Sequence, residues 1–145
     1  MSERAVPEFH CHRCVYTWVP RRTFVRMCPR CKSTLWNVPK IVAPTLGTGL
    51  GVAEVIGSKR TRVLALLKEY GAKEVRVFGS VRRQEANAAS DLDILVDDLP
   101  GTSLLDVAHL KNDLRRILGR PVDVVEEQAL PWSMRPQVLA EAVPL

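Results

Sequence analysis

The stretch VRVFGSVRRQEANAASDLDILVD, residues 75–97, decides the fold, because it contains two strand patterns and the break between them. Residues 74–79 alternate apolar and polar side chains, which predicts a β-strand that ends at Gly79-Ser80. A short helix or turn is expected over 81–88, and the apolar run of 91–97 predicts a second strand. The sequence therefore predicts two strands joined through a corner that contains glycine.

Two acidic residues, Asp91 and Asp93, stand two positions apart in the second strand pattern. Because strand side chains alternate between the faces of a sheet, both carboxylates project from the same face. Two like charges on a partly buried face repel each other unless a cation neutralises them. The alternative is a solvated strand with scattered acids, of the kind that Asp97 and Asp98 represent just beyond it.

The flanking segments supply helices and a third strand. Apolar residues at helical spacing predict a helix between Ser58 and Gly71 and another over about 103–118. Residues 121–125 alternate as a strand and place Asp123 on the face opposite its valines. If this strand pairs beside the acidic strand, three carboxylates converge.

All four cysteines lie near the start of the chain, in two Cys-x-x-Cys pairs with thirteen residues between them. Pairs at this spacing predict a four-sulfur zinc site. Its ligands are Cys11, Cys14, Cys28 and Cys31. Because four thiolates leave no open coordination position, we expect a structural zinc ion and not a catalytic one. The alternatives are two disulfides, or replacement of one cysteine by His10 or His12.

This cysteine-containing segment resembles a zinc ribbon, including the Cys-Pro-x-Cys form of its second pair. It departs from the common pattern where Val15 and Lys32 stand in place of the glycine that follows each pair. Residues 15–19 and 23–27 are rich in β-branched and aromatic side chains, which predicts a β-hairpin between the pairs.

Charge is unevenly distributed along the chain, whose formal net charge is +5 at pH 7. Residues 1–41 carry eight basic and two acidic side chains, whereas the remainder is nearly neutral. The basic segment suits a weak contact with nucleic acid, although Trp18 and Trp36 are expected in its core and not as platforms for bases. No long apolar run is present, so we expect a cytoplasmic protein without membrane contact.

We therefore expect three parts: a zinc ribbon over residues 1–41, a linker or connecting arm over 42–57, and a catalytic domain over 58–145. The glycines of residues 47–51 superficially suggest a phosphate-binding loop. They lack the following Lys-Ser/Thr and a clear preceding strand, so we discount that interpretation.

Gly79-Ser80, ten intervening residues and Asp91-Leu-Asp93 resemble the GSx10DxD signature of the DNA polymerase beta nucleotidyltransferase superfamily. The short length resembles the minimal nucleotidyltransferases of that superfamily. The resemblance implies a small α+β domain with a mixed sheet, like the polymerase beta palm, and with helices on one face. In this sequence the zinc ribbon precedes that domain.

The resemblance also implies a site. Gly79 and Ser80 are expected to bind the triphosphate of ATP, while three carboxylates hold two Mg²⁺ ions, oxygen ligands being suited to that cation. The three carboxylates are Asp91, Asp93 and Asp123. Arg83 matches an arginine of the family, and either Arg82 or Arg83 is expected to neutralise triphosphate charge. Gln84 stands where the family usually has glycine.

The resemblance implies transfer of AMP from ATP to a hydroxyl of a partner macromolecule, because a domain of this size has no second domain to enclose an acceptor. In the minimal family the partner is a HEPN-type RNase toxin, whose tyrosine is nucleotidylated, so the chain is expected to be the antitoxin. The rival hypothesis is a non-catalytic zinc-ribbon protein that binds nucleic acid or the toxin. Transfer to a small molecule is disfavoured, because the extra substrate domain of such enzymes is missing.

Overall fold

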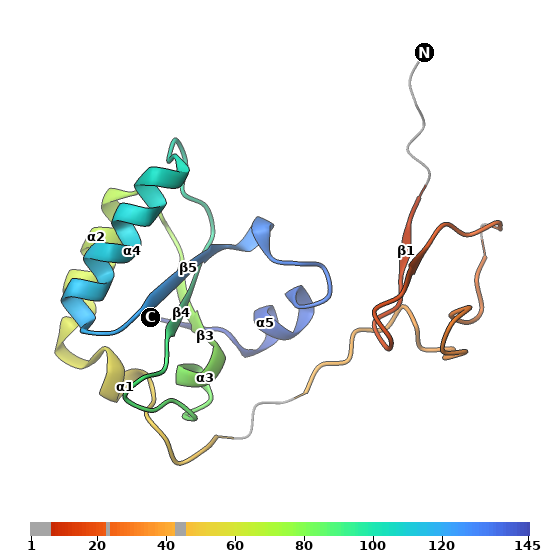
Figure 1. The fold of residues 1–145 in the computed structure, drawn as a ribbon, viewed down its shortest axis with the longest axis horizontal. Helices are drawn as coiled ribbons and strands as arrows, with labels where there is room; N and C mark the ends of the chain where they lie inside the picture. The colour runs from red at the N-terminus through yellow and green to blue at the C-terminus, as the bar shows by residue number, and fades with distance from the viewer. Residues whose placement is uncertain (1–6, 23, 43–45) are drawn as a thin grey trace. The chain divides into compact units, whose positions relative to one another are not determined.

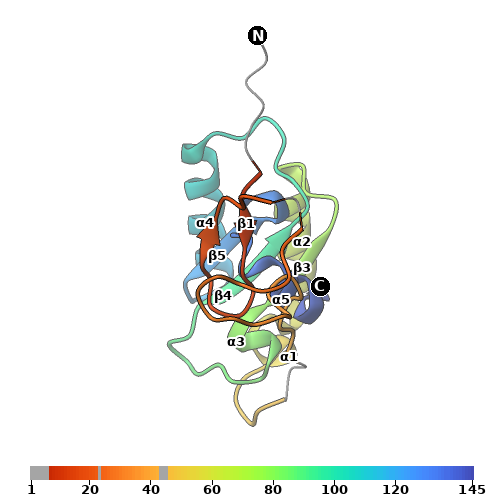
Figure 2. The same ribbon diagram turned by 90° about the vertical axis from the view of Figure 1, so that its right-hand side faces the viewer.

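The computed structural model describes residues 7–22, 24–42 and 46–145. The chain forms two compact units, divided between Val42 and Ala43 (Figures 1 and 2). No helix among the described residues is long and apolar enough to cross a membrane.

The second unit is built on a four-stranded mixed sheet in the order β5-β4-β3-β6. Its strands are β3 (Val75–Phe78), β4 (Leu92–Val96), β5 (Val122–Glu126) and β6 (Val143–Pro144). β3 pairs antiparallel with β4 and with β6, whereas β4 and β5 run parallel. A parallel pair needs a crossover connection, and the helix predicted over 103–118 provides it. The predicted α+β fold with a mixed sheet is confirmed.

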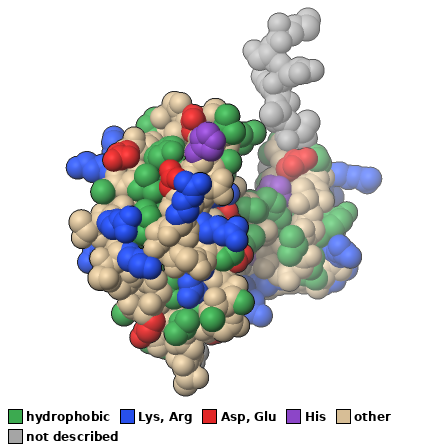
Figure 3. Space-filling model, turned by 60° about the vertical axis from the view of Figure 1, so that its left-hand side comes forward, with side chains coloured by type: hydrophobic (Ala, Val, Ile, Leu, Met, Phe, Trp, Pro, Cys, Tyr) green, Lys and Arg blue, Asp and Glu red, His purple; other side chains and the backbone are tan. Residues whose placement is uncertain are grey.

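Two longer helices, α2 (Arg60–Glu69) and α4 (Leu104–Leu118), cover one face of this sheet, and the short α5 (Arg135–Glu141) lies against the other (Figure 1). The shorter elements are α1 (Val52–Val55), η1 (Gly57–Lys59), α3 (Gly79–Arg82) and η2 (Glu127–Ala129). Lys and Arg side chains are spread over the outward side of α2 and α4, so that side is solvated (Figure 3).

The side chains of β4 alternate between the two faces of the sheet, so the second unit has two apolar layers. Leu92, Ile94 and Val96 are fully buried beneath α2 and α4, where they form the main core. On the other face Leu95 packs with Phe78 and with α5 in a smaller cluster. The period-2 pattern of the sequence therefore corresponds to two buried faces, and the side chain of Asp93 shares the face of Leu95.

The described part of the predicted connecting arm is ordered against the second unit. The N–H of Gly47 donates to the carbonyl of Arg83 at 2.8 Å, and that of Gly49 to Gln84 at 2.6 Å. An added Cβ at Gly47 would lie 2.7 Å from the Gln84 carbonyl, and one at Gly49 2.6 Å from that of Ala86. These glycines thus serve the close approach of two backbones, and residues 43–45 lie outside the described part.

The first unit holds a two-stranded sheet of β1 (Phe9–His10) and β2 (Thr17–Trp18). The predicted hairpin between 15–19 and 23–27 is wrong: β2 pairs instead with β1, residues 24–27 form no strand, and Thr23 lies outside the described residues. The first cysteine pair itself makes the tight turn that brings β1 and β2 together. The Cys11 N–H donates to the carbonyl of Tyr16 beside that turn.

The four cysteines gather as the spacing predicts. Their Sγ atoms all lie within 4.8 Å of one another, and all four are free thiols, which excludes the disulfide alternative in this structure. Backbone N–H groups of Arg13 and Arg30 donate to the Sγ atoms of Cys11 and Cys28 at 3.3 and 3.4 Å. Burial raises the pKa of the Cys28 thiol, but hydrogen bonds from the Cys31 and Arg30 backbone, together with the Cys14 and Cys11 thiols, lower it to about 7. Burial raises the pKa of the neighbouring Cys14 thiol to about 11. Thiolates at this spacing fit a zinc ion.

Contacts between aromatic rings supply the apolar packing of the first unit. Phe9 stacks on Trp36 at 5.3 Å between centroids, and Trp18 meets Trp36 edge-on at 5.1 Å. Both tryptophans contact other rings of the unit, but each is only half-buried, and Trp18 also lines a groove at the surface, so neither is a fully buried core residue. A core of three rings is small for a fold of about 40 residues, and a metal ion held by the four cysteines would add to its stability.

Among the described residues, three that are not glycine have a left-handed backbone conformation. Val15, Lys32 and Gln84 have φ angles of 63°, 60° and 57°. These are the three positions at which the sequence lacks an expected glycine. The backbone thus keeps the turn that glycine would favour, at a cost of about 1–2 kcal/mol each.

We predict one zinc ion per chain, held by the four cysteines, as elemental analysis of purified protein will measure. A chelator should remove it and unfold the first unit alone, because the second unit has its own core. We expect the fluorescence of Trp18 and Trp36 to become that of solvent-exposed tryptophan. The thermal unfolding transition of the second unit should be retained. Protein without zinc and with all four thiols oxidised would contradict it.

Candidate active site

The acidic residues come from neighbouring parallel strands. Asp93 in β4 stands directly opposite Asp123 in β5 in the register of the sheet, so both carboxylates project from the face that α5 covers. Asp91 lies one residue before β4 and is exposed. The structure thus brings Asp123 beside Asp93, as predicted from the strand pattern. Asp91 lies at the strand end, does not line the cavity that Asp93 and Asp123 share, and acts on Asp93 through charge repulsion.

Asp93 is the least solvated of the three acids. Burial raises the pKa of its carboxyl, and repulsion from Asp123 and then Asp91 raises it further, while Arg83 opposes the shift. Grouped carboxylates whose charged forms are mutually destabilised are a suitable donor set for a hard divalent cation such as Mg²⁺. The chemistry of these oxygen donors suits the Mg²⁺ that the sequence predicts. Among the described residues, however, the four cysteines are the only group of three or more Cys, His, Asp or Glu side chains gathered closely enough to hold a metal ion, so the magnesium site of Asp91, Asp93 and Asp123 stays a prediction.

Gly79 permits the closest contact in this region. It forms the corner between β3 and α3 with a φ of 76°, and a Cβ added to it would lie 2.3 Å from Oδ2 of Asp93. No side chain fits there. The glycine is therefore required by the approach of Asp93, a reason that the sequence pattern alone does not reveal.

The other predicted residues take different places. Ser80 is the second residue of α3, and its carbonyl accepts from the Glu85 N–H at 2.9 Å. Arg83 lines the cavity beside the acids, whereas the Nε of Arg82 donates to the backbone carbonyl of Glu141 at 2.7 Å. Of the two arginines, Arg83 is the one placed to meet a ligand.

A cavity of about 600 Å³ opens beside these groups. Gly79, Arg83, Asp93 and Asp123 line its polar side, and Leu130, Met134 and Val138 are among the residues of its apolar side. Pockets of this size and mixed lining suit a small-molecule ligand. The sequence analysis named no residue of the apolar wall, because nothing local connects residues 130–138 with the acids.

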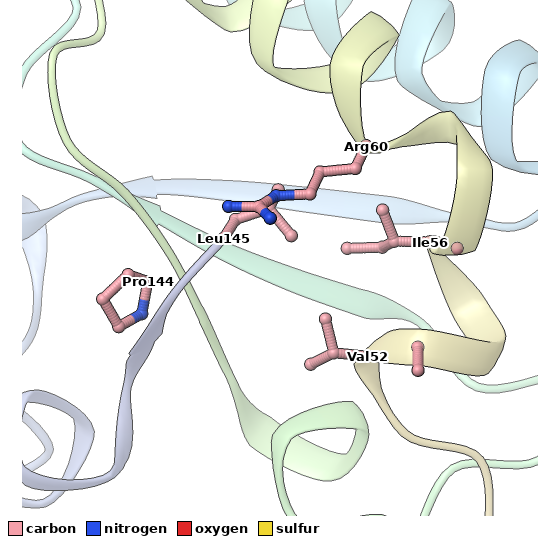
Figure 4. A pocket seen from close by; sticks show the side chains of 7 residues that line it. Val52, Ile56, Arg60, Pro144 and Leu145 are labelled. Atoms are coloured by element: carbon pink, nitrogen blue, oxygen red, sulfur yellow. The ribbon is translucent and has the colours of Figure 1, made fainter.

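A second cavity of about 430 Å³ lies elsewhere in the same unit. Val52, Ile56, Arg60, Pro144 and Leu145 surround it (Figure 4). Arg60 is the one charged side chain in its lining, and none of the predicted site residues reaches it. The acidic cavity is therefore the candidate active site.

Two charged residues near the acids were missed by sequence reasoning. The Nζ of Lys111 in α4 lies 2.9 Å from Oδ1 of Asp123, both side chains being partly exposed. Any cation bound by Asp123 must compete with this ammonium group. Glu141 is buried and accepts a hydrogen bond from the Gly79 N–H at 3.0 Å. A charged residue among the apolar neighbours Leu139, Ala140, Ala142 and Val143 was a signal that something must pair with it.

Asp93→Asn tests the electrostatic description. Because the fold raises the pKa of Asp93, its charged form costs stability at neutral pH, so without divalent metal the variant should unfold at a higher temperature than wild type. The advantage should vanish once the pH falls well below the ordinary value of 3.8, where the carboxyl is protonated in both states. Magnesium-dependent ATP binding should be lost.

Asp91→Asn, at an exposed carboxylate, should change the unfolding temperature less. An unfolding temperature of Asp93→Asn equal to or below that of wild type would contradict the description.

With the geometry described, comparison with known proteins identifies the family. Residues 60–145, more than half of the chain, match the model of the nucleotidyltransferase domain. A protein of Methanocaldococcus jannaschii described as a protein adenylyltransferase is 36% identical over 88 residues, which is 61% of this chain and 95% of that protein. The protein adenylyltransferase MntA of Thermococcus cleftensis is 41% identical over 78 residues, 54% of this chain and 79% of that protein.

Solved structures agree. A minimal nucleotidyltransferase is 47% identical with a TM-score of 0.58, and the match covers 68% of this chain and 100% of that chain. A toxin–antitoxin structure with AMP-PNP shares the fold at 21% identity and a TM-score of 0.52, over 58% of this chain and 69% of that chain. The chain therefore belongs to the nucleotidyltransferase domain family, and it is a nucleotidyltransferase.

Proposed function

We propose that this nucleotidyltransferase moves AMP from ATP to a hydroxyl group of a partner protein. The observation that carries the proposal is the pairing of Asp93 with Asp123 in the register of two parallel strands, beside the Gly79-Ser80 corner and in one cavity. Relatives described as protein adenylyltransferases support this choice of donor and acceptor.

In this proposal Asp91, Asp93 and Asp123 hold the magnesium ions, and Asp123 lies nearest the acceptor. When bound, the metal neutralises triphosphate charge and activates the attacking hydroxyl. The Ser80 hydroxyl and the backbone N–H groups that follow Gly79 bind phosphate oxygens, because the Gly79 N–H already donates to Glu141. Arg83, which lines the cavity, adds positive charge at the triphosphate, whereas Arg82 acts by anchoring α3 to Glu141.

The acceptor must be presented by another molecule. The second unit, as described over residues 46–145, is a single small sheet with its helices, so it has no second lobe of its own to enclose an acceptor. We propose a toxin as the partner, and specifically the HEPN-type RNase that the sequence resemblance implies, which makes this chain an antitoxin. A solved toxin–antitoxin structure with the same fold supports a toxin as the partner. Consumption of ATP and four free thiols both suit the cytoplasm, which we propose as the compartment.

The first unit offers a second contact surface. A groove of about 520 Å³ is lined by Tyr16, Trp18, Arg21, Arg22 and Phe24, among others. Phe24 is 73% exposed, and Arg30 lies over the ring of Tyr16. Aromatic rings between arginines suit the bases and phosphates of a single strand. We propose that this groove makes a weak contact with single-stranded nucleic acid.

Transfer is tested directly with labelled ATP, magnesium and the cognate partner. Wild type should place label on the partner protein, and Asp123→Asn should abolish transfer more completely than ATP binding, because Asp123 serves the attacking hydroxyl. Asp113→Asn, at another partly exposed aspartate with a basic partner, is the matched control and should transfer normally.

The rival hypothesis makes a different prediction for the same experiment. A non-catalytic antitoxin neutralises the partner by occlusion, so neutralisation would persist without label and in Asp123→Asn alike. That outcome would overturn the proposed transfer.

Nucleic-acid binding is measured by the anisotropy of a labelled single-stranded oligonucleotide at low salt. Phe24→Ala should weaken binding by about tenfold, since stacking on one base contributes about 1–3 kcal/mol. Arg21→Ala with Arg22→Ala should also reduce the dependence of affinity on salt. Leu104→Ala is the control, because Leu104 is 92% exposed and lies in the second unit. Equal affinity in wild type and the groove variants would exclude this groove.

A further inference from the structure

Among the described residues Glu141 is the one charged side chain that is buried, with 4% of its surface exposed. It is the last residue of α5. Burying a carboxylate costs several kcal/mol unless hydrogen bonds and opposite charge compensate it. Its partners therefore show what the residue does.

Those partners all belong to the segment that begins with the Gly79-Ser80 corner. Oε1 of Glu141 accepts from the Gly79 N–H at 3.0 Å and from Nη1 of Arg83 at 3.1 Å. Its Oε2 lies 3.4 Å from the same Arg83 nitrogen. Its backbone carbonyl accepts from Nε of Arg82. One residue thus contacts Gly79 at the start of α3, Arg82 at its end, and Arg83 directly after it.

The dependence of α3 on these contacts follows from its length. It spans only Gly79–Arg82, and a helix of four residues has no stability of its own. Its orientation must come from tertiary contacts, and three of those end on Glu141. The carboxylate also fixes Arg83 from one side while Glu85 holds its Nε at 2.9 Å from the other.

These contacts lie in the wall of the acidic cavity. Glu141, Gly79, Arg83 and Asp93 line it together. Glu141 is not a further metal ligand of the acidic group, because its oxygens are occupied by the Gly79 N–H and the Arg83 guanidinium. Its negative charge instead requires Arg83 to remain beside the acids.

We infer that Glu141 is a positioning residue for the triphosphate: it holds the Gly79-Ser80 corner and the Arg83 guanidinium in the orientation that receives the phosphates. The inference rests on the proposed function. It assigns to the end of α5, far along the chain from the GSx10DxD pattern, the task of arranging the groups that meet the nucleotide.

A comparison of two ligands separates positioning from simple support of the fold. Glu141→Ala should weaken binding of magnesium ATP by about tenfold or more and leave adenosine binding within about twofold, because only ATP carries the phosphates that α3 and Arg83 meet. Glu141→Gln retains an acceptor for the Gly79 N–H but loses the charge, so its loss should be smaller. Isothermal titration calorimetry on the full chain measures both ligands.

Glu127→Ala is the matched control. Glu127 lies on the same face of the sheet and forms ion pairs with Arg76 and Arg135, but it does not line the cavity. Its removal disturbs a partly exposed ion-pair network that includes Arg135 of α5, without touching α3. The ratio of ATP affinity to adenosine affinity should therefore equal that of wild type.

A double-mutant cycle supplies a second measurement if Glu141→Ala fails to fold. Arg83→Gln should lower ATP affinity, and adding Glu141→Gln to it should produce little further loss, since the two residues act through one contact. Additive losses, an unchanged ATP affinity in Glu141→Ala, or equal losses for ATP and adenosine would each overturn the inference.

The same titrations separate this inference from the proposed function. If wild type binds no magnesium ATP, the proposed function and this inference are both overturned. If wild type binds normally and the variants are unaffected, the inference alone is overturned.

Discussion

The register between β4 and β5 is the constraint on which the second unit depends. Leu92 stands opposite Val122 and Ile94 opposite Val124, and these four side chains belong to the main core. The same register places Asp93 beside Asp123 on the other face. A slip of one residue would bury the acids and expose the valines, so the apolar face stabilises the geometry of the acidic face. The hydrophobic effect thus arranges two carboxylates that repel each other.

Features with a local pattern were predictable from the sequence. The alternation of 74–79 and 91–97 marked β3 and β4, and helical spacing with Ser103 and Gly119 at its ends marked α4. The cysteine spacing marked the four-sulfur cluster, since two paired ligands impose the same geometry wherever they occur. In each of these the information lies within about 20 residues of sequence.

Features made by contacts between distant segments were not predictable in the same way. Glu141 meets Gly79 across 62 residues of chain, and the ion pair between Lys111 and Asp123 joins a helix to a strand. The pairing of β1 with β2 was missed for a different reason: β1 has two residues, too few for any period to appear. The absence of glycine at three positions of the family patterns did not change the turns, because Val15, Lys32 and Gln84 adopt the left-handed backbone that glycine would favour.

The arm that precedes α1 has a consequence for any shortened form of this protein. The backbone of residues 47–50 hydrogen-bonds to Arg83, Gln84 and Ala86, in the loop between the Gly79-Ser80 corner and β4. A chain that begins at residue 58 would leave those carbonyls without their donors and would remove the buried side chains of Val55 and Ile56 from the main core. A fragment that keeps all of these contacts therefore begins no later than Gly47, upstream of residues 60–145 that match the family.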